Sequence, residues 1–170
     1  MANTQQSTWV FGYGSLIWGT GAVVTVERRE GILPGWHRAW TWISSSRFGE
    51  PTCSLEDGGQ VRGVFLRLNP ETANVDLEEF RRRENRNTEK TVADVPVAGA
   101  VTFFWTMGNN LGRFPEFDGL SGSRLAQALA DRAKQITTPG QDGVLAADYI
   151  RRVHDFDPND AWTAEIARFL

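Results

Sequence analysis

The segment Gly12-Tyr13-Gly14-Ser15-Leu16 places two glycines and a hydroxyl group directly after an apolar stretch. Thr8 to Tyr13 is predicted to form a short buried strand. A strand that ends in Gly-x-Gly-Ser leaves several backbone N–H groups without bulky side chains around them. Successive N–H groups of this kind can form a nest that binds an anion. The alternative is a tight turn that only reverses the chain, and the local pattern does not decide between the two.

Two familiar glycine motifs do not fit this loop. A dinucleotide-binding fingerprint needs a third glycine that opens a helix, which Leu16-Ile17-Trp18 does not supply. A nucleophile elbow needs Gly-x-Ser-x-Gly, whereas Ser15 is followed by Leu16 and Ile17. Ser15 also has no obvious base, because His37 and His154 lie in segments with structural patterns. Neither a Rossmann site nor a serine hydrolase is therefore predicted.

Glu84 is the acid whose position best suits proton transfer. A helix is predicted after Pro70, and Leu77, Phe80 and Glu84 follow at i, i+3, i+7 spacing, so the acid shares a face with two apolar residues. Partial burial of a carboxyl group raises its pKa toward neutrality, which suits a general acid or base. The alternative is an exposed helix acid that pairs with Arg81 or another basic neighbour.

The elements that must position these residues run from strands to helices. Trp36 to Ile43 alternates like a half-buried strand, and Thr91 to Met107 is predicted to be a strand pair or one long bent strand, broken near Pro96 and Gly99. Pro34-Gly35 and Asp57-Gly58-Gly59 are predicted to be turns. Later segments predict helices, among them one that Asp160 caps. This order indicates an α+β fold, with helices concentrated in the C-terminal half, in one domain over residues 1–170.

Composition excludes several classes of protein. The 170 residues carry a net charge of -3, which gives no sign of nucleic acid or an anionic membrane as a partner. The arginines around residues 81–86 are balanced by glutamates and are interpreted as a solvated helix face. One cysteine and two histidines cannot make a typical zinc site. The N-terminus lacks the apolar core of a signal peptide, so a cytoplasmic location is expected.

Several segments, in the same order, resemble the γ-glutamylcyclotransferase superfamily, particularly its ChaC-like branch. The opening signature and the later matching stretches are Phe11-Gly12-Tyr13-Gly14-Ser15-Leu16-Ile17-Trp18, Leu33-Pro34-Gly35-Trp36-His37-Arg38-Ala39-Trp40, Ser45-Ser46-Arg47-Phe48-Gly49, Gly59-Gln60-Val61-Arg62-Gly63-Val64, Arg82-Arg83-Glu84 and Asp148-Tyr149-Ile150. The likeness spans roughly residues 9 to 155.

The resemblance implies a mixed, partly closed β-sheet or barrel with flanking helices, and an enzyme that releases 5-oxoproline from a γ-glutamyl compound. The implied catalytic residue is Glu84. The implied substrate-binding residues are Tyr13, Gly14, Ser15, Leu16, Arg47 and Tyr149. Neither a metal nor a cofactor is implied, and the partner is a small molecule: glutathione, a γ-glutamyl dipeptide or a γ-glutamylamine.

The chain departs from the resemblance after the acid, where Asn85-Arg86-Asn87 replaces the usual glycine and aromatic residue. This departure predicts a different wall of the substrate pocket. Two alternatives stay open: a binding protein without catalytic activity on the same fold, and an amidohydrolase that attacks γ-glutamyl amides with water. The sequence gives no prediction of the oligomeric state.

Overall fold

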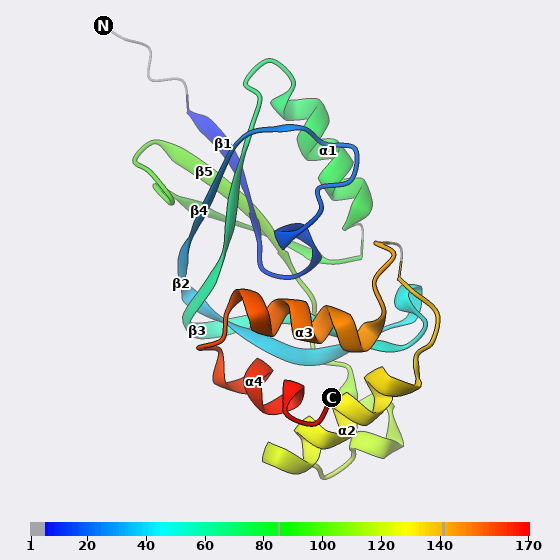
Figure 1. The fold of residues 1–170 in the computed structure, drawn as a ribbon. Helices are drawn as coiled ribbons and strands as arrows, with labels where there is room; N and C mark the ends of the chain where they lie inside the picture. The colour runs from blue at the N-terminus through cyan, green and yellow to red at the C-terminus, as the bar shows by residue number, and fades with distance from the viewer. Residues whose placement is uncertain (1–5, 85, 141) are drawn as a thin grey trace, which may run out of the picture. The chain divides into compact units, whose positions relative to one another are not determined.

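The computed structural model describes residues 6–84, 86–140 and 142–170. Its elements in chain order are β1 (Ser7–Gly12), β2 (Thr25–Ser44), β3 (Glu50–Leu68), α1 (Ala73–Arg83), β4 (Thr88–Ala93), β5 (Ala100–Thr106), α2 (Gly122–Gln135), α3 (Ala146–Phe156) and α4 (Ala161–Ala167), as Figure 1 shows. Three strands and α1 precede residue 85, β4 and β5 follow, and the other three helices lie after β5, which confirms the α+β class and the position of most helices. No helix of the described residues is both long and apolar enough to cross a membrane.

The chain forms two compact units, each built from two separate stretches of sequence. The first unit joins the stretch that ends at Gly35 to Gly58–Met107, and it holds β1, α1, β4 and β5. The second unit joins Trp36–Asp57 to Gly108–Leu170, and it holds α2, α3 and α4. The strands β2 and β3 each contribute to both units. The single domain expected over residues 1–170 stays a prediction.

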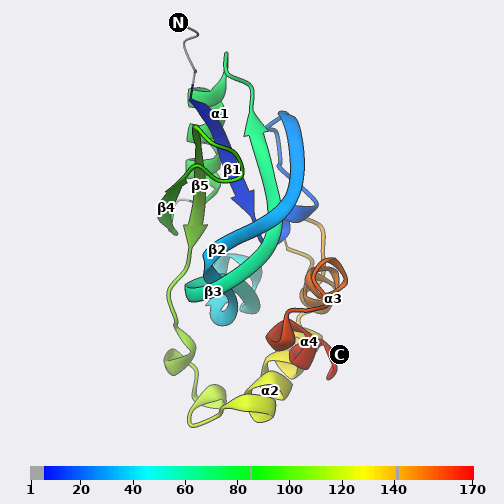
Figure 2. The ribbon, with the colours of Figure 1, turned by 90° about the vertical axis from the view of Figure 1, so that its left-hand side faces the viewer.

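A mixed sheet in the order β2-β3-β1-β5-β4 organises the strands (Figure 2). Strand β1 pairs antiparallel with β3 and parallel with β5. Trp9, Val10 and Phe11 of β1 are each at most 1% exposed. A continuous apolar run suits a central strand that is covered on both faces. Strands β4 and β5 pair antiparallel, which confirms the predicted strand pair.

Two predicted turns were wrong. Pro34-Gly35 lies inside β2, and Asp57-Gly58-Gly59 lies inside β3. Gly35, Gly58 and Gly59 have φ values of 83°, 99° and 74°, which glycine adopts without the steric cost of a side chain. These residues lie where each strand passes from one unit to the other. Glycines inside a strand mark bends as well as turns. The glycines therefore do mark changes of chain direction, but the prediction that the strands end there is wrong.

In the second unit, polar bonds join the C-terminal half of β2 to the last two helices. The buried Arg38 donates to Asp157 at 2.9 Å and to Asp160 at 2.7 Å. Trp40 donates through its indole N–H to the Thr163 hydroxyl at 2.8 Å. Asp160 also accepts the backbone N–H groups of Trp162 and Thr163, which confirms it as the cap of α4. These bonds satisfy charges that would be costly to bury alone.

Candidate functional site

The loop after β1 presents backbone donors. The chain leaves β1 at Gly12 and enters a 3-10 turn over Ser15–Ile17. Later N–H groups of the turn are satisfied internally, for Ile17 donates to the Gly14 carbonyl at 2.9 Å and Gly19 donates to the Ser15 carbonyl at 3.1 Å. Within the described parts of the chain, the N–H groups of Gly14, Ser15 and Leu16 have no backbone acceptor outside regular secondary structure. This is the donor set that an anion-binding nest requires.

Packing fixes this loop against the sheet. A Cβ atom on Gly12 would lie 2.5 Å from the Leu16 Cβ, so only glycine lets the loop fold back over the strand end. Leu16 itself is 8% exposed. The buried Tyr13 donates its hydroxyl to the Trp105 carbonyl in β5 at 2.5 Å. Tyr13 and Leu16 therefore anchor the loop through their side chains, while Gly14 and Ser15 lie between the two anchors.

Glu84 is the C-cap residue of α1. Leu77 and Phe80, which precede it on the helix, are 6% and 1% exposed, and the Glu84 side chain is 20% exposed. The predicted helix and the buried positions of Leu77 and Phe80 are therefore confirmed. Glu84 lies one residue beyond the end of α1, and its side chain is largely shielded from solvent. Its Oε2 accepts a hydrogen bond from the Asn87 side-chain amide at 2.5 Å.

Arg83 links the loop to the acid. Its Nη2 donates to the Ser15 hydroxyl oxygen at 3.0 Å, and its Nη1 donates to the Gly19 carbonyl at 3.1 Å. Its Nε lies 3.6 Å from Oε1 of Glu84. The structure thus brings together two predicted sites, the loop and Glu84, which are separated by almost seventy residues of sequence. All of these contacts lie within the first unit.

Sequence reasoning missed Arg83 and Asn87. The sequence pattern predicts a solvated basic face for this stretch, which is correct for Arg82, because Arg82 pairs with Glu79 on the helix surface. The Arg-Arg-Glu stretch was a usable signal, since it puts an arginine directly before the proposed base. Asn87 lies in the stretch where the chain departs from the family pattern. Asn85 of that stretch falls outside the described residues.

Arg47 and Tyr149 lie in the second unit and contact each other. The Arg47 guanidinium lies 4.9 Å from the centre of the Tyr149 ring. It also pairs with Glu50 and, at 3.2 Å, with Asp142. Burial opposes the charge on Arg47, but Glu50, Tyr149 and Asp142 together outweigh that effect and raise the pKa of Arg47. Arg47 thus has protein carboxylates as partners, so its role toward substrate stays a prediction.

Tyr149 is a core ring. It is 2% exposed and packs edge-on against Trp40, with ring centres 5.5 Å apart. Burial raises the pKa of its hydroxyl above the usual range. A hydroxyl in this state stays protonated at neutral pH and can serve only as a hydrogen-bonding group. The structure places Arg47 and Tyr149 in the unit that does not hold Glu84 and the loop.

The described residues contain no cluster of three or more histidine, cysteine, aspartate or glutamate side chains that could hold a metal ion. The cysteine, Cys53, is buried in the second unit. Burial raises the pKa of its thiol above the usual range, so it is not a candidate nucleophile. Glu84 is a partly buried carboxylate, and the neighbouring Arg83 bonds to the donor loop.

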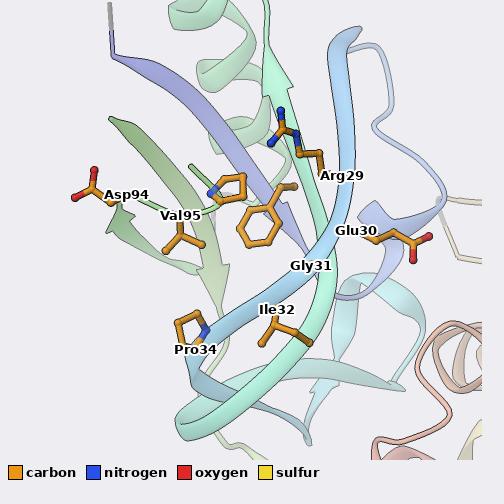
Figure 3. Close-up of a pocket in the computed structure, with 9 residues that line it drawn as sticks. Arg29, Glu30, Gly31, Ile32, Pro34, Asp94 and Val95 are labelled. Carbon is orange, nitrogen blue, oxygen red and sulfur yellow. The ribbon is translucent and has the colours of Figure 1, made fainter. Parts of the chain in front are cut away.

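A shallow depression of about 420 Å³ lies elsewhere in the first unit, between β2 and the β4–β5 connection (Figure 3). Its lining residues are Arg29, Glu30, Gly31, Ile32, Pro34, Phe65, Asp94, Val95 and Pro96. The carboxylates of Glu30 and Asp94 point away from it in opposite directions (Figure 3). None of the lining residues belongs to the predicted site.

Comparisons with known proteins find a ChaC-like family model and γ-glutamylcyclotransferases. A family model described as ChaC-like protein matches residues 8–103. The glutathione-specific gamma-glutamylcyclotransferase of Escherichia coli (strain K12) is 38% identical over 81 residues, 45% of this chain and 35% of that protein. The match thus spans about a third of that relative's length. A yeast γ-glutamyl cyclotransferase specific to glutathione has a similar fold, with a TM-score of 0.67 at 15% identity over 96% of this chain and 95% of that chain.

Proposed function

The chain belongs to the ChaC-like protein family, and from this premise we propose that it is a γ-glutamylcyclotransferase with Glu84 as its general acid and base. The observation that carries the proposal is the meeting of the donor loop and Glu84 in one unit, joined through Arg83. The relative named as glutathione-specific makes glutathione the first candidate substrate. A small-molecule partner and a cytoplasmic location are part of the same proposal.

The reaction is an intramolecular aminolysis. The α-amino nitrogen of the γ-glutamyl group attacks its own γ-carbonyl carbon, so a new C–N bond closes the five-membered ring. The bond from that carbon to the leaving nitrogen then breaks. Glutathione would give 5-oxoproline and cysteinylglycine, without consumption of water. Because both reacting groups belong to one molecule, a site that holds the folded conformer removes most of the entropic barrier, about 7–11 kcal/mol in well-oriented cases.

Glu84 handles the proton in this scheme. Its carboxylate accepts a proton from the α-ammonium group, which leaves a neutral amine that can attack, and then delivers a proton to the leaving nitrogen. Proton transfer by a positioned side chain typically contributes about 10²–10⁴-fold in rate. The Asn87 amide donates to Oε2 of the carboxylate, and Nε of Arg83 lies 3.6 Å from Oε1, so neighbouring side chains orient the carboxylate.

The loop handles the charge that develops on the carbonyl oxygen. The N–H groups of Gly14, Ser15 and Leu16 are preorganised by the 3-10 turn and by the buried side chains of Tyr13 and Leu16. Donors that are already in place stabilise an oxyanion without reorganisation during the reaction. Removal of one such donor commonly costs about 10²–10³-fold in kcat.

A substrate panel tests the proposal. The purified protein is incubated with glutathione, a γ-glutamyl dipeptide and a γ-glutamylamine, and both 5-oxoproline and free glutamate are measured. We expect 5-oxoproline, with glutathione turned over fastest. Free glutamate as the product would indicate hydrolysis by water instead. Binding of these compounds without any product would indicate a binding protein.

A further inference from the structure

Arg83 differs from the other two arginines at the end of helix α1 in what it binds. Arg81 and Arg82 pair with glutamates on the surface. Arg83 instead donates to the Ser15 hydroxyl at 3.0 Å and to the Gly19 carbonyl at 3.1 Å. Ser15 is the first residue of the 3-10 turn, and Gly19 follows the turn. The side chain of Arg83 therefore bonds the helix α1 to both ends of this part of the loop.

The same guanidinium also reaches the acid. Its two terminal nitrogens are used on the loop, and its Nε lies 3.6 Å from Oε1 of Glu84. A guanidinium is planar and presents its donors in fixed directions, whereas a lysine ammonium is a single point on a flexible stem. One planar group thus donates two hydrogen bonds to the loop and lies within ion-pair distance of the Glu84 carboxylate.

We propose that Arg83 is a positioning residue for the cyclisation. It holds the loop and the Glu84 carboxylate in the arrangement in which both contact the same γ-glutamyl group. This inference rests on the function proposed above. Arg83 acts through Ser15 and Glu84, and it is not itself the base or the oxyanion donor. Its side chain is 28% exposed, which leaves it partly shielded at the junction of helix and loop.

Arg83 also directs the Ser15 hydroxyl. A serine hydroxyl has one donor proton and two acceptor lone pairs. Because the oxygen accepts a bond from Arg83, its own proton points away from the guanidinium and is available for substrate. Arg83 therefore adds a directed side-chain donor to the backbone donors of Gly14, Ser15 and Leu16.

The variant Arg83→Met tests the inference, with Arg82→Met as its matched control. Both substitutions remove one positive charge from neighbouring positions of α1, and Arg82 contacts neither the loop nor Glu84 through any bond between described residues. We expect kcat for 5-oxoproline release to fall by about 10–100-fold in Arg83→Met, since small misplacements of reacting groups cost rate on this scale. KM should rise by a smaller factor, and Arg82→Met should resemble the parent. Equal kcat in the two variants would overturn the inference.

The conservative variant Arg83→Lys separates charge from geometry. It keeps the positive charge but loses the planar set of donors. We expect its kcat to lie between those of the parent and Arg83→Met. Full parent activity in Arg83→Lys would show that the positive charge alone is enough for activity. It would overturn the role assigned to the planar set of guanidinium donors.

Amide hydrogen exchange of residues 14–19 gives a readout that does not depend on turnover. Exchange in this loop should be faster in Arg83→Met than in Arg82→Met, because the bonds that close the loop are lost. Unchanged exchange would overturn the inference even if activity fell. A parent protein that releases no 5-oxoproline, but whose loop responds to Arg83→Met, would refute the proposed function and still support the coupling of loop and helix.

Discussion

At the scale of single residues, Ser15 offers two separable contributions, one from its backbone N–H and one from its hydroxyl. The hydroxyl accepts from Arg83, and the N–H belongs to the donor loop. Substitution of the side chain removes the first contribution and leaves the second. The loss of activity on removal of the hydroxyl therefore separates its contribution from that of the backbone N–H groups.

We predict that Ser15→Ala lowers kcat/KM by about 1–2 kcal/mol, roughly 5–30-fold, because a hydrogen bond to a charged group is lost. Steady-state release of 5-oxoproline measures the effect. Thermal unfolding should change little, since Ser15 lies at the surface of the loop and is only half-buried. Parent activity in this variant would leave only the backbone of the loop in the mechanism.

The sequence predicted Glu84 better than it predicted the partners of Glu84. The i, i+3, i+7 spacing predicted that Leu77 and Phe80 are buried, which the structure confirms, whereas Glu84 lies just beyond the helix as its C-cap. Arg83 could not be predicted in the same way, because its partners Ser15 and Gly19 are distant in sequence. Local periodicity shows which face of a helix is apolar. It does not show which loop reaches that helix end.

At the scale of elements, the close approach of β1 and β3 sets the start of the donor loop. A Cβ atom on Gly63 of β3 would lie 2.4 Å from the Gly12 carbonyl oxygen and 2.4 Å from Cζ of Phe11. Phe11 is fully buried and cannot move aside. The loop begins at the residue after Gly12, so strand packing and loop geometry are linked.

We predict that Gly63→Ala destabilises the protein by about 1–3 kcal/mol, the usual cost of excess volume in a packed core. Urea unfolding measures this change as a lower midpoint at unchanged slope. The control is Gly112→Ala, where a Cβ atom would meet nothing within 4 Å. Equal midpoints for the two variants would contradict the packing described here. Gly63→Ala should also lower activity, because Gly12 is displaced.

The strands β2 and β3 show where element prediction failed. Their glycines signalled turns, but the two strands continue through Gly35 and through Gly58-Gly59. A positive φ inside a strand and a positive φ in a hairpin turn have the same sequence signature. Only pairing with neighbouring strands separates the two cases, and that pairing is not local information.

At the scale of the whole molecule, the fold class could be predicted from the order of elements, and the division into two units could not. Each unit draws on two separate stretches of the chain, because the chain passes from one unit to the other within β2, within β3 and again after Met107. The predicted site residues are divided between the same two units. Glu84 and the loop fall in the first unit, and Arg47 and Tyr149 fall in the second.

The central claim is that Glu84 moves the proton in a cyclisation, and the variant Glu84→Gln tests it most directly. Glutamine keeps the size of the side chain and removes the base. The matched control is Glu79→Gln, an exposed acid on the same helix that pairs with Arg82. With glutathione as substrate and 5-oxoproline as the measured product, we predict a loss of about 10²–10⁴-fold in kcat for Glu84→Gln and parent activity for Glu79→Gln. Release of 5-oxoproline by Glu84→Gln at the parent rate would contradict the account.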